Sequence, residues 1–125
     1  MIFDTDIFIW IQRGHSKAFS LVEQTEERFL SLQTYLELLQ GAKNKQQHQI
    51  IKQFLNDFGF ITLPLTENIG HRALIYLEEY TLKSGLMAAD AIIAATAVEN
   101  NLLLASSNQK HFKIIDDLKL QVFKP

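Results

Sequence analysis

Three acidic residues in this chain have apolar neighbours and no basic residue close in sequence. Asp4 follows the apolar run "MIF", Glu37 lies within "TYLELLQG", and Asp90 is the single charged residue of "LMAADAIIAATA". Neither Lys nor Arg stands within one helical turn of any of the three, so local ion pairs cannot balance them. An ionised carboxylate in apolar surroundings is unfavourable unless something else compensates its charge.

Carboxylates that converge in one place can be compensated by a hard divalent cation. Mg²⁺ and Mn²⁺ take carboxylate oxygens, water and phosphate oxygens as ligands. Such an ion polarises a phosphoryl oxygen and activates a bound water that attacks phosphorus in line with the leaving oxygen. We therefore predict that Asp4, Glu37 and Asp90 come within a few ångströms of one another and act as metal-binding catalytic residues.

The remaining residue types offer no competing chemistry. The chain has no Cys, which excludes disulfides, thiolate metal sites and Cys nucleophiles. Its four histidines, His15, His48, His71 and His111, are far apart and none is spaced i,i+4, so a His-rich zinc site is not expected. We expect the histidines to be surface or packing residues, with His111 near Asn108 as a candidate substrate contact.

Each acid also has a purely structural interpretation. Asp4 and Asp90 are both placed where an N-terminal helix cap is common, and Glu37 can point outward from a half-buried helix. For each acid taken alone the structural role is favoured. The metal-site interpretation depends on all three meeting in space.

The elements that must bring the acids together alternate between strands and helices. Short apolar runs predict strands at 1–3, 28–31, 60–63, 102–105 and 120–123. Helical spacing predicts one helix through Ile7, Trp10 and Ile11 that ends before Gly14, and a second that holds Ala18, Leu21 and Val22. Further helices are predicted over 32–41, with Gly41 as a C-terminal cap, from Asn44 to near Gly59, from Thr66 through Tyr80, and around Asp90. This alternation is typical of an α/β fold in which helices cover a central, mainly parallel sheet and ligands bind at the carboxyl ends of strands.

Composition sets the remaining limits. A chain of 125 residues, 47% of them hydrophobic, fits one domain spanning 1–125. A net charge of −2 excludes a protein that grips nucleic acid by bulk charge. The apolar start lacks a positive n-region and is interrupted by two aspartates, and no apolar run reaches the roughly 18 to 20 residues needed to cross a bilayer. We expect a cytoplasmic protein without a membrane segment.

Five segments together resemble a known family. In order, spacing and length, "MIFDTDIF", "TYLELLQG", "LMAADAIIAATA", "LLLASSNQKHF" and the final "LQVFKP" are similar to the PIN domain, specifically the VapC-type toxins of bacterial toxin-antitoxin pairs. The resemblance spans essentially the whole chain. It implies a PIN-like three-layer α/β/α sandwich and a metal-dependent endoribonuclease that uses Mg²⁺ or Mn²⁺.

Carried over by position, the resemblance assigns roles around the acidic site. Asp4, Glu37 and Asp90 match the family's metal-binding acids, and Asp6 lies where the family often has Asn or Asp. Thr5 and Ser106 match hydroxyl positions that orient carboxylates or water.

One position departs from the family pattern. Asn108 stands where many relatives have a fourth acid, and it offers a neutral amide as a possible metal ligand or as a group that orients the ligands. A second metal would then bind more weakly, or only when an RNA phosphate completes its shell. Asp116 and Asp117 lie beyond the matching segment, and we expect them in a solvated turn.

The resemblance also implies partners: an RNA substrate, a cognate antitoxin and a second copy of the chain in a homodimer. Metal binding by four acids, Asp4, Asp6, Glu37 and Asp90, would change the formal charge from −2 to +2. Candidate RNA contacts are the basic residues that follow the catalytic elements, Arg13, Lys17, Lys43, Lys45, Lys110 and Lys113. The apolar residues Phe8, Trp10 and Ile11 fit either a surface covered by the antitoxin or the core.

Two alternative functions remain open from the sequence. A phosphatase of the haloacid dehalogenase type loosely matches "DTD", Ser106, Lys110 and "IIDD", but it explains neither Glu37 nor Asp90. A catalytically weak or inactive PIN-like binding module would keep the carboxylates as structural groups. The sequence does not indicate the RNA target, the antitoxin or the number of metal ions.

Overall fold

The computed structural model describes all 125 residues, and short apolar runs form its strands. The strands are interspersed with seven helices, six of which the periodicity predicted. In chain order the elements are β1 Ile2–Phe3, α1 Thr5–Gln12, α2 Ser16–Gln24, β2 Phe29–Ser31, α3 Leu32–Gly41, α4 Lys45–Asp57, β3 Ile61–Leu63, α5 Glu67–Ser84, α6 Ala88–Glu99, β4 Leu104–Ser106, α7 Gln109–Phe112 and β5 Leu120–Val122.

The five strands form one sheet in the order β3-β2-β1-β4-β5, and every neighbouring pair is parallel. From β1 the chain first adds β2 and β3 on one side, and it then returns to add β4 and β5 on the other. The strand order therefore reverses between β1 and β4. In open α/β sheets this is the point where ligands bind, outside the carboxyl ends of the strands.

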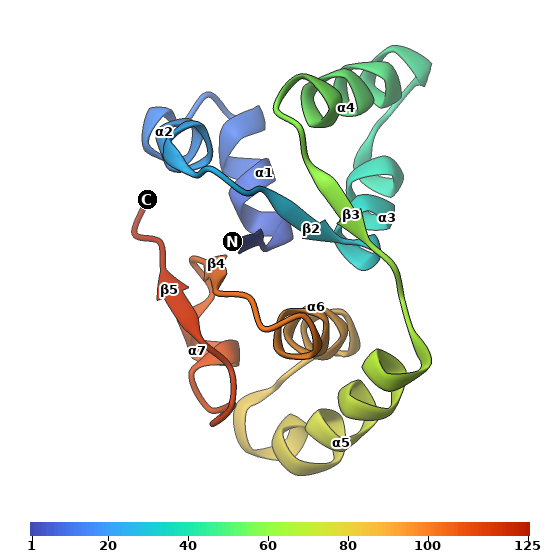
Figure 1. Cartoon of the computed structure of the whole chain (residues 1–125), viewed down its shortest axis with the longest axis vertical. Helices are drawn as coiled ribbons and strands as arrows, with labels where there is room; N and C mark the ends of the chain where they lie inside the picture. The colour runs from blue at the N-terminus through green and yellow to red at the C-terminus, as the bar shows by residue number, and fades with distance from the viewer.

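The sheet separates two hydrophobic cores. Ile2 and Leu104 face a core shared with α5 and α6, whereas Phe3, Leu30 and Ala105 face a core shared with α1, α2 and α4. Successive strand residues point to opposite faces, so the neighbours Ile2 and Phe3 serve different cores. Figure 1 shows α5 and α6 on one side of the strands and α1 to α4 on the other. The predicted three-layer α/β/α sandwich is confirmed.

Side-chain caps start the helices that matter for the site. Asp4 caps α1 by accepting from the Thr5 amide, and Ser31 caps α3 by accepting from the Thr34 amide. Each cap residue ends a strand or directly follows one, so the same residue ends the extended segment and starts the helix. At the other end of α5, Gly85 has a left-handed φ of 77°, which favours glycine.

Two details differ from the expectations, and a third decides between two interpretations. Gly41 is the last residue of α3 and Ala42 is its cap, in an extended conformation that does not require glycine. A short helix, α7, follows the turn at Asn108, where no helix was predicted. Phe8 is 3% exposed and belongs to the core rather than to an open patch. The core role was one of the two interpretations of Phe8.

None of the helices is both long enough and apolar enough to pass through a bilayer.

Candidate acidic site at the carboxyl edge of the sheet

Asp4 and Ser106 meet where β1 and β4 end. Phe3 is aligned with Ala105 across the two strands, so the next residue on each strand lies at the same edge. The Ser106 hydroxyl donates to Asp4 Oδ2 at 2.7 Å, and the Thr5 amide donates to Asp4 Oδ1 at 2.8 Å. Asp4 is only 5% exposed. The first acid is thus buried and held at both oxygens at the point where the strand order reverses.

The surroundings of Asp4 disfavour its negative charge. Burial is the largest cause, and the nearby charges of Asp6 and Asp90 add to it, so the pKa of Asp4 is raised to about 8. The hydrogen bonds from Ser106 and Thr5 act in the opposite direction and are too weak to restore an ordinary pKa. Asp6 and Asp90 are therefore close enough to Asp4 to interact with it electrostatically, as the predicted site requires.

Asp6 is held by the loop that follows β4. Its Oδ2 accepts from the Ser107 amide at 2.9 Å and also from the Ser107 hydroxyl. Its Oδ1 is buried and has no hydrogen-bond partner. A buried carboxylate oxygen without a donor is unfavourable, which leaves this atom available to a cation.

Glu37 is connected to the site through Thr5. The Thr5 hydroxyl lies 3.1 Å from Glu37 Oε1 and 3.0 Å from the Thr34 hydroxyl. Because Ser31 and Thr34 are themselves hydrogen-bonded at the start of α3, the first turns of this helix are fixed relative to α1. Thr5 thus links the start of α1 to Glu37 on α3.

Asp90 contacts a histidine. Its Oδ2 lies 2.9 Å from His111 Nδ1 and accepts from the Met87 amide at 3.3 Å. Asn108 Nδ2 lies 3.1 Å from the same imidazole nitrogen. The N-cap of α6 is Met87, not Asp90, although Asp90 helps to cap the helix from its first turn. The four ion pairs of the chain leave Asp4, Glu37 and Asp90 without a Lys or Arg partner, as expected.

The carboxylates share one region but do not form a preassembled metal cage. No group of three or more His, Asp or Glu side chains lies close enough together to hold an ion. The expectation that three or four carboxylates lie within a few ångströms is therefore not met. Instead of converging on one point, the Asp90 carboxylate contacts His111, and the Glu37 carboxylate contacts Thr5. Sequence reasoning did not pair His111 with Asp90, because that pairing depends on the unpredicted helix α7.

The predicted RNA contacts do not form one patch. Arg13 packs over the Trp10 ring at 5.7 Å, and Lys17 reaches the Lys124 carbonyl at 3.4 Å. Lys43 and Lys45 are exposed at the start of α4, whereas Lys110 is exposed on α7. Figure 1 places α4 and α7 on opposite sides of the molecule.

An apolar groove runs from Glu37 between α1, α3 and α4. Two adjoining cavities of about 330 and 210 Å³ form it, and both are lined by Gln12, Leu38, Ile50 and Ile51. The first cavity also includes Glu37. The second is lined almost entirely by hydrophobic residues, among them Phe8, Ile11 and Phe54.

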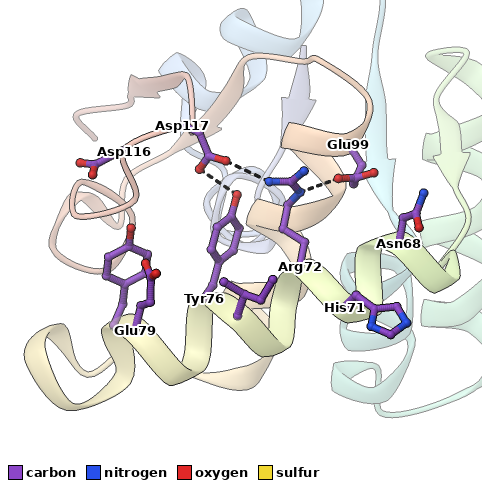
Figure 2. Close-up of a pocket in the computed structure, with 10 residues that line it drawn as sticks. Asn68, His71, Arg72, Tyr76, Glu79, Glu99, Asp116 and Asp117 are labelled. Carbon is purple, nitrogen blue, oxygen red and sulfur yellow. Dashed lines mark hydrogen bonds and ion pairs between the residues drawn. The ribbon is translucent and has the colours of Figure 1, made fainter.

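A second polar pocket, of about 560 Å³, lies on the α5 side of the molecule (Figure 2). Arg72 bridges Glu99 and Asp117, and the Tyr76 hydroxyl donates to Asp117 Oδ1 at 2.9 Å. Burial and the hydrogen bond to Asp117 raise the pKa of Tyr76. Asp116 and Asp117 lie in an exposed turn, as expected. From this turn the Asp117 carboxylate also ties the C-terminal segment to α5 through Arg72 and Tyr76.

The fold and the site together define a class of protein. A parallel sheet with helices on both faces, whose strand order reverses beside a buried carboxylate, defines the chain as an α/β/α domain. The PIN domain family model matches residues 1–118. The chain belongs to the PIN domain family, which confirms the resemblance seen in the motifs.

Solved structures with the same fold come from toxin-antitoxin systems. A chain of a toxin-antitoxin complex from Klebsiella pneumoniae is 31% identical, with a TM-score of 0.79 over 94% of this chain and 93% of that one. VapBC-1 from nontypeable Haemophilus influenzae gives 26% identity and a TM-score of 0.77 over 98% of both chains. VapBC2 from Rickettsia felis, bound to a promoter DNA fragment, is 24% identical, with a TM-score of 0.76 over 99% and 100%. The comparison with curated protein sequences gave no match.

Proposed function

We propose that this chain is a metal-dependent endoribonuclease, the toxin of a VapC-like toxin-antitoxin pair, acting in the cytoplasm. The observation that carries the proposal is the buried Asp4 at the reversal of strand order, near Asp6 and Asp90 and without a Lys or Arg partner. Family membership supports it, as does the similarity to chains of toxin-antitoxin complexes.

The candidate ligands of the site are carboxylate and amide oxygens, which are the ligand types that a hard divalent ion prefers. Asp4, Glu37 and Asp90 would hold Mg²⁺ or Mn²⁺, with Asp6 and Asn108 as further oxygen donors. The partnerless, buried Oδ1 of Asp6 and the unfavourable charge at Asp4 are the structural features that a cation would relieve. When bound, the ion would supply Lewis-acid activation of a phosphodiester and of an attacking water.

The surrounding residues prepare these donors. Ser106 donates a hydrogen bond to one oxygen of Asp4. This bond limits rotation of the carboxylate, which would have to bind the ion from a fixed direction. Thr5 holds Glu37, and His111 holds Asp90. Asn108 lies beside His111 and contributes no charge, so a second ion would depend on the RNA phosphate for much of its coordination.

The groove beside Glu37 suits the antitoxin. It is apolar along Phe8, Ile11 and Phe54, and it begins at a proposed catalytic acid. A helix or extended segment laid into such a groove would bury apolar area and cover the site together. Leu82, in the last turn of α5, is 96% exposed, and Met87, the N-cap of α6, is 63% exposed. These two exposed apolar residues are candidates for a homodimer interface.

Asp90→Asn tests the function most directly. The thermal midpoint of the wild-type protein should rise with Mg²⁺ or Mn²⁺ concentration, because a ligand that binds only the folded state stabilises it. The variant should lose both this shift and RNA cleavage while remaining folded. Glu67→Gln, a substitution of an exposed acid on α5, is the matched control and should keep both.

The same experiment separates the alternatives. A metal-dependent shift without cleavage of any RNA would favour a PIN-like binding module, and full cleavage by Asp90→Asn would remove Asp90 from the mechanism. The phosphatase alternative is disfavoured by family membership and by Asp117, which binds Arg72 and Tyr76 instead of facing Asp4. A phosphorylated Asp4 trapped during turnover would revive it.

A further inference from the structure

An open pocket between the end of α5 and α7 is lined by three lysines. Its volume is about 660 Å³, and its lining residues are Lys83, Ser84, Gly85, Lys110, Lys113 and Ile114. No acid lines it, and all three lysines are exposed. None of the three takes part in an ion pair or a side-chain hydrogen bond of the chain. Their positive charges therefore add together, in a protein whose net charge is −2.

This pocket adjoins the acidic site through one side chain. The Nε2 atom of His111 lies 3.9 Å from the position that a Cβ on Gly85 would take, and Gly85 lines the pocket. The other ring nitrogen, Nδ1, lies 2.9 Å from Asp90 Oδ2. A single imidazole thus separates the lysine pocket from a proposed catalytic carboxylate.

We propose that Lys83, Lys110 and Lys113 form a binding site for backbone phosphates of the RNA strand whose scissile bond lies at the acidic site. The inference rests on the proposed ribonuclease function and adds a substrate-binding site to it. Lys110 was a candidate from the sequence, and Lys113 was named with it, whereas Lys83 joins them only because the chain folds the end of α5 against α7.

The chemistry of the pocket favours a polyanion held by charge. Lysine ammonium groups bind phosphate as flexible point charges and do not read bases. Only Ile114 offers an apolar contact in the pocket, so an acidic protein segment would find no hydrophobic anchor there. A single strand, by contrast, needs successive positive charges along its backbone, beside the site that cleaves it.

The test measures RNA binding without catalysis. A fluorescent 2′-O-methyl oligonucleotide, which resists cleavage, is titrated in the presence of a chelator at several NaCl concentrations. The triple variant K83Q/K110Q/K113Q is compared with K52Q/K119Q/K124Q, which makes the same charge change at exposed lysines outside the pocket. Each phosphate contact to a single strand contributes about 0.7 to the slope of log K against log salt, so the pocket variant should lose about 2 from that slope relative to the control.

Each result has a defined consequence. If the pocket variant keeps the slope of the control, or the wild type binds no RNA, the phosphate site is wrong. Cleavage of unmodified RNA with Mg²⁺, measured separately, decides the proposed function, so the two failures are distinguishable. Preferential binding of an acidic peptide over RNA at these lysines would also overturn the proposal. If the triple variant does not fold, each single Lys→Gln variant should lower the slope by about 0.7.

Discussion

His111 Nδ1 lies 2.9 Å from Asp90 Oδ2, and the two residues are separated by 21 positions in the chain. The contact occupies one oxygen of the carboxylate and leaves the other free. In the tautomer that carries a proton on Nδ1, the imidazole donates to Asp90 and fixes the orientation of the carboxylate. The position of Asp90 therefore depends on α7 as well as on α6.

Loss of this donor should weaken metal binding. His111→Ala should raise the dissociation constant for Mn²⁺, measured by calorimetry, by about tenfold or more, because groups that orient a ligand commonly contribute that much. His111→Gln keeps an N–H donor and should recover part of the affinity. An unchanged dissociation constant in His111→Ala would show that Asp90 needs no support from α7.

Asp4 should make the metal-free protein less stable as the pH rises. Its pKa is about 8 in the folded state, against 3.8 for an ordinary Asp, so between these values the folded state holds a proton that the unfolded state has lost. The free energy of unfolding should therefore fall as the pH rises through this interval. Urea denaturation with a chelator present should show this fall in the wild type and a flatter profile in Asp4→Asn. An equal slope in both proteins would contradict the role of Asp4.

Ser106 should matter most when Asp4 is charged. Ser106→Ala removes the 2.7 Å hydrogen bond to Asp4 Oδ2, and hydrogen bonds to charged groups contribute about 1.5 to 3 kcal/mol. The loss of unfolding free energy should be larger above the pKa of Asp4 than below it. Ser84→Ala, which removes a hydroxyl bonded to the Tyr80 carbonyl, is the control and should show no such pH dependence. Denaturant unfolding at two pH values measures both.

The network around Arg72 should stabilise the fold without affecting the site. Tyr76→Phe removes the 2.9 Å hydrogen bond to Asp117 and should lower the free energy of unfolding by about 1 to 2 kcal/mol. Tyr35→Phe is the control, since the Tyr35 hydroxyl makes no hydrogen bond in the structure. Affinity for Mn²⁺ should be unchanged in both variants. A change in affinity would show that the pocket of Figure 2 is coupled to the acidic site.

The groove between α1, α3 and α4 should be tested with a change on its rim. Ile50 is 60% exposed and lines both cavities, so Ile50→Glu should weaken binding of the cognate antitoxin and leave RNA cleavage unchanged. Leu74→Glu places the same charge at a residue that is 56% exposed on α5 and is the control. Rescue of cell growth by the co-expressed antitoxin is the measurement. Equal rescue of both variants would show that the partner binds elsewhere.

Sequence reasoning predicted the architecture because the short apolar strands and amphipathic helices have clear periods. It also predicted which acids lack a basic neighbour, since that depends only on local sequence. It did not predict which hydrogen-bond partners the acidic side chains have within the site. The contacts of Asp90 with His111 and of Glu37 with Thr5 join elements that are far apart in the chain, so the local sequence does not indicate them. It correctly expected Asp117 in an exposed turn but did not predict its ion pair, because the partner Arg72 is 45 positions away.

The hydrogen bond between Ser106 and Asp4 joins positions that are 102 residues apart. During synthesis on the ribosome, β1 emerges well before β4 and cannot pair with it until β4 has been made, and such distant pairings form late. A partly synthesised chain therefore has no assembled acidic site. For a protein proposed to cleave RNA, this topology means that the site cannot assemble before β4 has been synthesised.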